Sequence, residues 1–298
     1  MSEAADPRYR ELDLWDDRTA LSALWEAQLA AVAAVGPALP AIASAVATLA
    51  ARLAGGGRLV YAGAGTSIRV AVQDGSELGP TFDWPEARVL YLIAGGEGAL
   101  RQAVEGAEDD AAAAEAQVAA AGIGPADAVI GIAASGRTPF TVAAVRAARA
   151  AGALTIGLAG TEVCPLSQAA EHPVCLATGP EAVAGSTRMK AGTAQKVALN
   201  LLSTQTMVRL GRVHAGLMVD MRPANAKLKA RARGMVMHLA GTDAAGAEAA
   251  LDAAGGRVKL AVLIALGLTV DAALRALAEN DDVLRRALSR APKTERGS

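Results

Sequence analysis

The chain has 298 residues, enough for one large domain or two small ones, and 52% of them are hydrophobic although only 3% are aromatic. Its formal net charge is −1, from 29 basic and 30 acidic residues, which argues against a nucleic-acid partner and against attraction to an anionic membrane surface. A core of Ala, Val, Leu and Ile favours helices packed closely on a parallel sheet. Cys164 and Cys175 lack metal-site spacing and are predicted to be free thiols in a reducing cytoplasm.

No export signal is expected in the N-terminal part. Residues 1–16 are polar and acidic, are predicted to be flexible, and lack the basic and apolar regions of a signal peptide. Hydrophobic periodicity predicts helices over residues 17–35 and 40–54. The run 29–51 is uncharged, but it is alanine-rich and two prolines divide it, so we expect two soluble helices and no membrane span.

A glycine-rich turn follows the first predicted strand, residues 58–62. The turn 63–67 (Gly-Ala-Gly-Thr-Ser) is expected to lead into a helix from about Ile68. Glycines let backbone N–H groups approach an anion, and a helix N-terminus favours negative charge. No Walker lysine follows, and Ile68 stands where the dinucleotide fingerprint has its third glycine. Alone, the run is equally typical of a plain strand–helix turn. The candidate phosphate ligands here are Gly65, Thr66 and Ser67.

Four further strands alternate with helices. The strands are predicted at residues 88–94, 126–134, 154–159 and 173–177, and one of the intervening helices at 97–105. This alternation predicts βαβ units and a doubly wound, parallel five-stranded sheet flanked by helices, which binds ligands at the carboxyl ends of its strands. Two more turns after strands offer amides, hydroxyls and an arginine, which together point to a phosphate. Their candidate ligands are Ser135, Gly136, Arg137 and Thr138, and then Ser186, Thr187, Arg188 and Lys190.

The rest of the chain is predicted to be helical. A long helix is expected from Thr187 to about residue 210, and a basic helix over 223–239 is most simply a solvated face. Three more helices are expected at 242–254, 258–266 and 270–288. The predicted organisation is a main α/β domain with its N-terminal helices over 17–239, a small C-terminal helical subdomain over 240–290, and a polar tail over 291–298.

Carboxylates are better acid–base candidates than histidines. His172, His214 and His238 form no Ser/His/Asp order and no metal pair. Glu77 lies between the first strand end and a Pro/Gly loop, and Glu108 follows a glycine break. Carboxylates beside a phosphate site are suited to general acid–base catalysis, although periodicity alone favours a surface residue for Glu77 and, for Glu108, an acid at a helix N-terminus stabilised by the helix dipole.

Six stretches, in order between about residues 20 and 235, carry a family resemblance. The longest is 185–196 (Gly-Ser-Thr-Arg-Met-Lys-Ala-Gly-Thr-Ala-Gln-Lys). The other five are 55–67, 92–97, 103–110, 129–139 and 217–220. Through these stretches the chain resembles the N-acetylmuramic acid 6-phosphate etherases of the sugar isomerase (SIS) domain superfamily.

The resemblance implies an SIS fold and a reaction. These enzymes cleave the D-lactyl ether of N-acetylmuramic acid 6-phosphate to N-acetylglucosamine 6-phosphate and D-lactate. C2 loses a proton, the lactyl group leaves, and water adds at C3, without metal or organic cofactor. The resemblance further implies that Glu77 and Glu108 are the acid–base pair, that Ser67, Ser135 and Thr138 hold the phosphate with the turn 186–190 closing the sugar site, and that the protein is a homodimer.

The chain departs from the family pattern at Ile68, where the family has glycine, and in the loop 78–84. These departures leave two other functions open. One is a non-catalytic sugar-phosphate-binding regulator, like the vertebrate glucokinase regulatory protein, and the other is a phosphosugar isomerase. Retention of both Glu77 and Glu108 favours the etherase.

Overall fold

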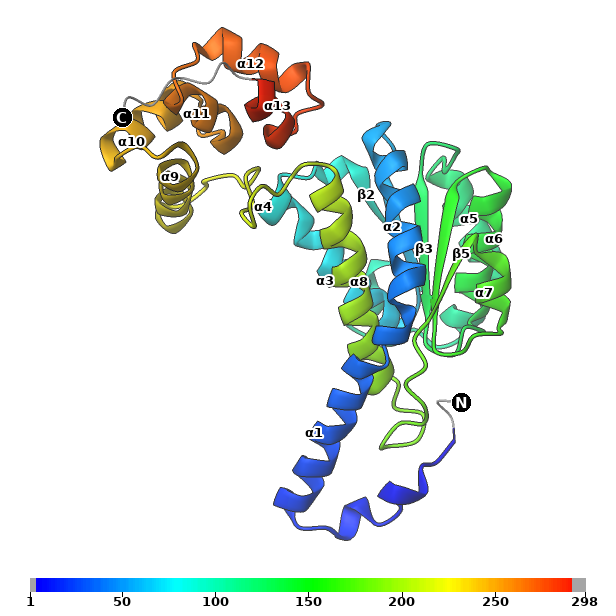
Figure 1. The fold of residues 1–298 in the computed structure, drawn as a ribbon. Coiled ribbons are helices and arrows are strands. Elements are labelled where there is room, and N and C mark those ends of the chain that lie inside the picture. The colour runs from blue at the N-terminus through cyan, green and yellow to red at the C-terminus, as the bar shows by residue number, and fades with distance from the viewer. Residues whose placement is uncertain (1–3, 291–298) are drawn as a thin grey trace. The chain divides into compact units, whose positions relative to one another are not determined.

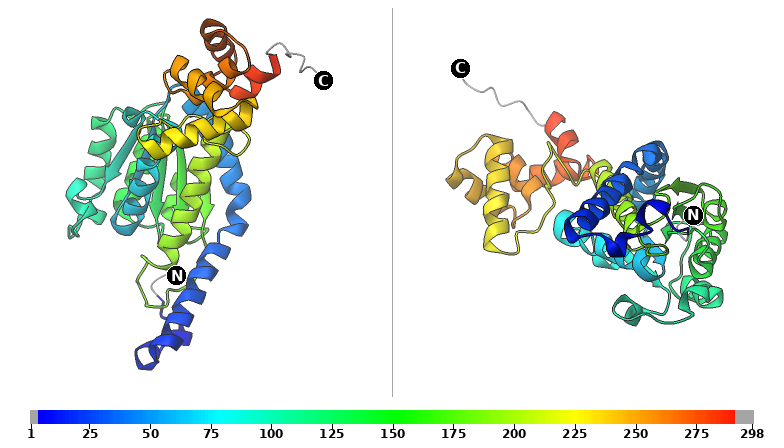
Figure 2. Two further views of the ribbon diagram at one scale, coloured as in Figure 1. Left: turned by 90° about the vertical axis from the view of Figure 1, so that its left-hand side faces the viewer. Right: turned by 90° about the horizontal axis from the view of Figure 1, so that it is seen from below.

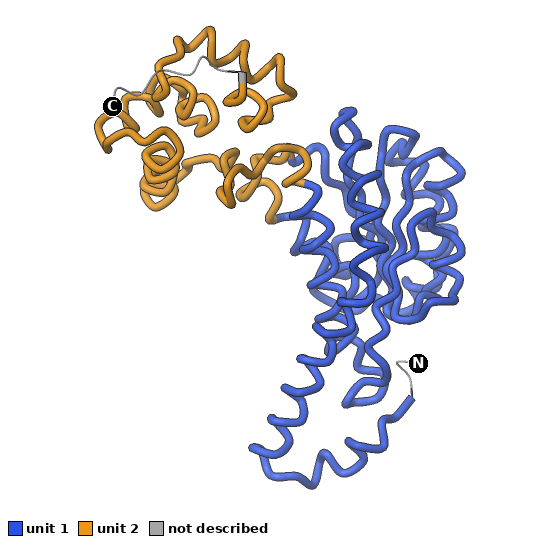
Figure 3. Tube along the Cα trace, viewed as in Figure 1, with its two compact units in different colours: residues 1–76, 86–206 blue, residues 77–85, 207–298 orange. Residues whose placement is uncertain are grey.

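A computed structural model describes residues 4–290 and divides into two compact units. Within this range, unit 1 comprises residues 4–76 and 86–206, and unit 2 comprises residues 77–85 and 207–290 (Figure 3). The chain therefore passes between the units at three points, after Ser76, Pro85 and Thr206. The predicted tail, 291–298, lies outside the described residues.

Unit 1 begins with helices at the predicted positions. They are the 3-10 helices η1 (Pro7–Tyr9) and η2 (Leu12–Leu14), α1 (Asp17–Ala33), the 3-10 turn η3 (Gly36–Ala38) and α2 (Leu39–Ala54). The Asp16 carboxylate caps α1 by accepting hydrogen bonds from the backbone N–H groups of Arg18 and Thr19. The expected break between two helices at Gly36 and Pro37 is confirmed.

The helical stretch Asp17–Ala54 is long and apolar enough to cross a membrane, with a mean hydropathy of 1.9 in its best window. Its second half nevertheless packs inside unit 1, where α2 contacts the sheet. Ile42, Val46 and Leu49 are each at most 4% exposed. A buried core helix can be as long and as apolar as a membrane-spanning helix, so the length and hydropathy of this stretch are only weak evidence that it crosses a membrane.

The centre of unit 1 is an all-parallel sheet of five strands in the order β2-β1-β3-β4-β5. The strands are β1 (Leu59–Gly63), β2 (Val89–Ile93), β3 (Ala128–Ala133), β4 (Leu154–Ala159) and β5 (His172–Cys175). Every residue of β1, β3 and β4 is buried, as expected for strands covered on both faces. The predicted doubly wound α/β fold is thus confirmed.

Helices cover both faces of this sheet. Figure 1 shows α5 (Ala111–Ala120), α6 (Pro139–Ala150) and α7 (Pro165–Ala169) on one face, and α2, α3 (Gly65–Ser76) and α8 (Lys190–Arg209) on the other. The turned views show α1 running out beyond these layers (Figure 2). The strand order reverses between β1 and β3, because β2 lies on one side of β1 while β4 and β5 lie beyond β3. Doubly wound sheets bind ligands at such a switch point, outside the carboxyl ends of the strands.

One predicted helix of unit 1 is wrong. Residues 97–105 form only the 3-10 turn η5 (Glu97–Leu100). The Arg69 guanidinium donates hydrogen bonds to the backbone carbonyls of Ala99 and Leu100, at 2.8 and 3.0 Å. These carbonyls therefore bond to a side chain and not to the N–H groups of a following helical turn. The segment is also bounded by Gly96 and Gly106, both at positive φ.

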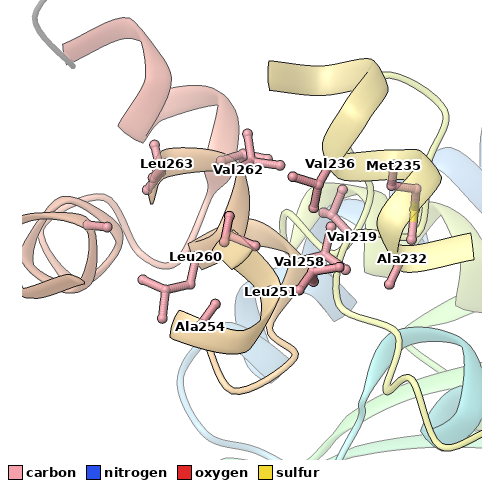
Figure 4. Packing of buried hydrophobic residues seen from close by; sticks show 14 of the residues in the cluster. Val219, Ala232, Met235, Val236, Leu251, Ala254, Val258, Leu260, Val262 and Leu263 are labelled. Carbon is pink, nitrogen blue, oxygen red and sulfur yellow. The ribbon is translucent and has the colours of Figure 1, made fainter. Parts of the chain in front are cut away.

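Unit 2 is helical. It contains α4 (Leu78–Phe82), α9 (Ala226–Ala240), α10 (Ala244–Ala253), α11 (Val258–Ala265), α12 (Val270–Ala278) and α13 (Leu284–Arg290). Figure 4 shows its apolar core, to which three segments contribute Val219, Val236 and Leu260. This unit takes in α9, whereas the sequence analysis grouped residues up to 239 with the main domain.

The helix predicted over 270–288 is interrupted. Asp281 and Asp282 adopt left-handed backbone conformations, with φ of 56° and 57°, and separate α12 from α13. Asp282 is held there by Lys259, whose ammonium group donates to its carbonyl at 2.7 Å and its carboxylate at 3.0 Å. Lys259 is 2% exposed and also contacts Asp220 at 2.6 Å, so this buried cation is paired.

Candidate functional site

The first turn of α3 presents backbone amides at the carboxyl end of β1. The helix begins at Gly65, three residues earlier than expected, so Thr66 and Ser67 lie in its first turn, where N–H groups have no intrahelical acceptor. Gly65 has a φ of +53°, a conformation that favours glycine. Half-buried Thr66 and buried Ser67 add hydroxyl groups. Amides, hydroxyls and a helix N-terminus together form a site suited to an anion.

A pocket of about 360 Å³ opens beside this turn. Gly65 and Thr66 line one part of it, and residues 103–108, ending in Glu108, line another. Glu108 is exposed and belongs to the 3-10 turn η6 (Ala107–Asp109). The structure therefore brings one candidate catalytic carboxylate and the predicted phosphate turn to a single pocket within unit 1.

Arg69 is a lining residue that the sequence analysis missed. It lies in the second turn of α3 and is tied to η5 through the two carbonyls described above. The helix dipole disfavours a cation near a helix N-terminus, so an arginine this close to the predicted helix start was the feature of the sequence that pointed to a role for Arg69. In the pocket its charge favours an anionic ligand.

The turn after β3 lies at the same edge, because β3 is the direct neighbour of β1. Gly136 has a φ of +67°, and a Cβ there would collide with Cys164, so a side chain is excluded. The Ser135 hydroxyl oxygen accepts a hydrogen bond from the Arg137 amide at 3.2 Å. Thr138 precedes α6 without a capping bond from its side chain. These residues occupy the position predicted for a second phosphate-binding turn.

The third predicted turn lies next to the first. A Cβ added to Gly192, in the first turn of α8, would lie 3.4 Å from the Thr66 Cγ2 atom. Ser186 and Thr187 are half-buried ahead of this helix, and Arg188 is exposed. The structure thus gathers the three turns at one end of the sheet.

Lys190 is buried, with 3% of its surface exposed, and its ammonium group donates to the Thr178 carbonyl at 3.0 Å. The amides of Lys190 and Ala191 donate to the Glu181 carboxylate, each at 2.9 Å. The fully buried Glu181 carboxylate therefore supplies a negative charge at the start of α8, where the helix dipole favours one. Sequence reasoning missed Glu181 because its partners, Lys190 and Ala191, lie nine and ten residues further along the chain. Contact of Lys190 with substrate stays a prediction.

Comparison with known proteins identifies the family. Residues 41–149 match the family model described as glucokinase regulatory protein N-terminal SIS domain, and residues 109–205 match the SIS domain. The chain is 53% identical over 277 residues to the N-acetylmuramic acid 6-phosphate etherase of Deinococcus radiodurans, with 93% of this chain and 91% of that protein covered. The chain belongs to the N-acetylmuramic acid 6-phosphate etherase family. The family resemblance in the sequence is thereby confirmed.

Other relatives agree. The etherase of Streptomyces avermitilis is 49% identical over 88% of this chain and 84% of its own, and that of Serratia proteamaculans is 45% identical over 97% and 98%. Among solved structures, a putative phosphosugar isomerase involved in capsule formation from Bacteroides fragilis is similar in fold, with a TM-score of 0.51 and 21% identity over 67% of this chain and 99% of that one.

Ile68, where the chain departs from the etherase family pattern, lies in the core and not in the pocket beside the predicted phosphate turn. Ile68 is 0% exposed and faces the core, where its Cβ lies 3.4 Å from the position a Cβ on Gly63 would take. It is not among the residues that line the pocket. The branched side chain therefore fills the interior of unit 1 and not the pocket.

Glu77, the other candidate catalytic residue of the etherase family, is exposed and is the first residue of unit 2. The loop 78–84, which departs from the family pattern, is packed within unit 2. Trp84 is 3% exposed, and the Arg212 guanidinium lies 5.7 Å from the centre of its ring. Asp83 forms an ion pair with Arg222. The residues that depart from the family pattern in this loop therefore have structural partners.

The etherase family is expected to need no metal. Among residues 4–290, the structure contains no cluster of three or more His, Cys, Asp or Glu that would hold one.

Replacing Ser67 with Ala is expected to raise KM for a sugar phosphate about 10- to 100-fold and to leave kcat little changed. A hydrogen bond to a charged group contributes about 1.5–3 kcal/mol, and a phosphate is bound equally before and during the chemical step. KM and the inhibition constant of inorganic phosphate measure this effect. Ser76→Ala, at the exposed far end of α3, is the matched control. An unchanged KM in Ser67→Ala would remove Ser67 from the phosphate site.

Proposed function

We propose that this protein cleaves the D-lactyl ether of N-acetylmuramic acid 6-phosphate, giving N-acetylglucosamine 6-phosphate and D-lactate. The enzyme would be a carbon–oxygen lyase that serves the recycling of cell-wall amino sugars. The observation that carries the proposal is the pocket of unit 1, where the phosphate turn at Gly65 and Thr66 and the carboxylate of Glu108 meet. Family membership and the retention of Glu77 support it.

The proposed chemistry is an elimination followed by a hydration. In the open-chain sugar, C2 lies beside the C1 aldehyde, so its proton is acidic enough for a carboxylate base. The electron pair left at C2 forms the C2–C3 double bond as the C3–O bond breaks, and a carboxylic acid protonates the departing lactyl oxygen. Water then adds at C3 and a proton returns to C2, which balances the reaction. Glu77 and Glu108 are the proposed acid–base pair.

Binding is proposed to depend on the phosphate. Anchoring a remote, non-reacting group fixes the position of the reacting carbons and provides binding energy that can be used in the transition state. The proposed phosphate ligands are Ser67, Ser135 and Thr138, with the turn 186–190 closing the sugar site. Arg69 adds a positive charge to the same pocket.

The test is release of D-lactate from N-acetylmuramic acid 6-phosphate, followed with a lactate-oxidising coupling enzyme. The etherase proposal predicts one lactate for each N-acetylglucosamine 6-phosphate formed. A regulator would raise its melting temperature with sugar phosphates but release no lactate, and an isomerase would interconvert an aldose and a ketose phosphate. Either outcome from well-folded protein would contradict the proposal.

The enzyme is proposed to act as a homodimer. An apolar stripe on α1 supports this, since Leu21, Trp25, Leu29 and Val32 recur at helical spacing and are 65%, 62%, 51% and 47% exposed. A second copy of the chain would cover this stripe. The compartment is proposed to be the reducing cytoplasm, where thiols such as those of Cys164 and Cys175 stay unpaired.

Replacing Trp25 with Glu is expected to convert the dimer into a monomer, because a charge would enter the apolar contact. Light scattering after size-exclusion chromatography measures the mass, which should fall to half. Ala30→Glu, at an exposed position on another side of α1, is the matched control and should stay dimeric. An unchanged mass for Trp25→Glu would place the interface elsewhere.

A further inference from the structure

Asp74 is a buried carboxylate that the proposed chemistry does not use. It lies in the last turn of α3 and is 2% exposed. Three side chains donate hydrogen bonds to it: the Tyr61 hydroxyl at 2.8 Å, the Asn200 amide at 2.6 Å and the Ser203 hydroxyl at 3.1 Å. Tyr61 belongs to β1, and the other two belong to α8. One carboxylate therefore joins three elements of unit 1.

These three donors are neutral, so the negative charge of Asp74 is stabilised by hydrogen bonds alone in this cluster. Burial, together with the charge of Asp74, raises the pKa of Tyr61 well above its usual value. The phenol therefore stays protonated and remains a donor. A buried carboxylate is a costly way to stabilise a fold, but a satisfied polar network of this kind fixes one geometry.

The surroundings leave this helix turn little freedom. The Tyr91 ring stacks on Tyr61, with ring centres 5.8 Å apart and planes inclined by 16°. A Cβ on Gly75, the residue after Asp74, would collide with the Tyr91 hydroxyl. The last turn of α3 is thus held by hydrogen bonds and by close packing.

The network also sits where the chain leaves unit 1. Asp74 lies two residues before the passage at Ser76, and Ser203 lies three residues before the passage at Thr206. At their other ends, α3 begins in the phosphate turn and α8 follows the turn 185–189. The two helices lie side by side (Figure 1), each with a predicted substrate turn at its start, and the shared network joins the last turn of α3 to the second half of α8.

We propose that Asp74 is a positioning residue that fixes the last turn of α3 and thereby the backbone from which Glu77 extends three residues later. The inference rests on the catalytic role proposed for Glu77. Binding depends on the turns at the starts of the helices, whereas proton transfer depends on the residue after α3. Loss of the network therefore lowers kcat and leaves KM nearly unchanged.

The test is a set of three variants assayed for lactate release. Asp74→Ala removes the carboxylate that accepts all three hydrogen bonds. It should lower kcat at least 10-fold, with KM within twofold of the wild type. Asp74→Asn keeps an oxygen for Tyr61, and the Asn200 amide can rotate to meet its new NH2 group, so this variant should recover most of kcat. Asn200→Ala removes one donor from an exposed position, keeps the fold, and should lower kcat by a few-fold.

Asp127→Ala is the matched control. Asp127 is 4% exposed and accepts hydrogen bonds from Arg58 and Gly124, but it lies at the amino end of β3, away from the strand ends that carry the site. This variant should be destabilised as Asp74→Ala is, yet keep kcat. A normal kcat in Asp74→Ala and Asn200→Ala, an equal loss in Asp127→Ala, or a rise in KM instead of a fall in kcat would overturn the proposal.

Hydrogen exchange separates this proposal from the proposed function, because it needs no substrate. The backbone N–H groups of residues 75–79, 81 and 82 should exchange at least 10-fold faster in Asp74→Ala than in the wild type, and at the wild-type rate in Asp127→Ala. Unchanged exchange in Asp74→Ala would overturn the positioning role even if the wild type releases lactate. Faster exchange in Asp74→Ala with a wild type that releases no lactate would instead overturn the proposed function and the catalytic part of this inference.

Discussion

Replacing Glu108 with Gln is expected to lower kcat for lactate release by about 10²- to 10⁴-fold, the usual contribution of general acid–base catalysis. Glutamine keeps the size of the side chain but cannot exchange a proton in the reaction. KM should change little, because Gly65 and Thr66, which line the same pocket, are untouched.

The control for this variant is Glu115→Gln, which removes the same charge from an exposed position on α5. It should keep wild-type kcat. A Glu108→Gln enzyme with normal kcat would show that the pocket at the β1 turn binds substrate without contributing a proton-transfer group.

Replacing Glu77 with Gln is expected to reduce lactate release by a similar factor, about 10²- to 10⁴-fold, because elimination requires both a base at C2 and an acid at the lactyl oxygen. Exchange of the C2 proton with D2O then assigns the two roles. The variant that has lost the base should be slowed by this factor in both exchange and lactate release. The variant that has lost the acid should still exchange the C2 proton.

Glu86→Gln, an exposed carboxylate just beyond the loop that follows Glu77, is the control and should behave as the wild type. A Glu77→Gln enzyme that releases lactate at the normal rate would remove Glu77 from the mechanism. Exchange retained by both variants would mean that a third group takes the C2 proton.

The sheet was predictable because its strands follow a simple physical rule. Strands covered on both faces are continuous apolar runs, as in residues 128–133, and the turns after them contain glycines that the backbone requires. Gly65 and Gly136 both adopt positive φ at the strand ends where phosphate turns were expected. Local sequence therefore determined the strands and the chemistry of the turns.

What sequence could not supply were the long-range contacts. The segment 97–105 does not form the predicted helix, and two of its backbone carbonyls accept hydrogen bonds from Arg69, some thirty residues earlier. The role of Glu181 depends on backbone amides nine and ten residues later, and the burial of the Ile68 side chain in the core depends on how the helix packs in the fold. Periodicity carries no information about such partners.

Asp74 illustrates the same limit for the candidate site. In the sequence it is one polar residue of a short run that ends in Glu77. Its partners Asn200 and Ser203 lie more than a hundred residues away, so their convergence is visible only in the fold.

The most direct test of the account is the reaction of N-acetylmuramic acid 6-phosphate in water labelled with ¹⁸O. Elimination and hydration predict that ¹⁸O enters the C3 hydroxyl of N-acetylglucosamine 6-phosphate and that the released D-lactate is unlabelled. In D2O, C2 of the product sugar should carry deuterium. Label in the lactate, or no lactate from folded protein, would contradict the proposed function.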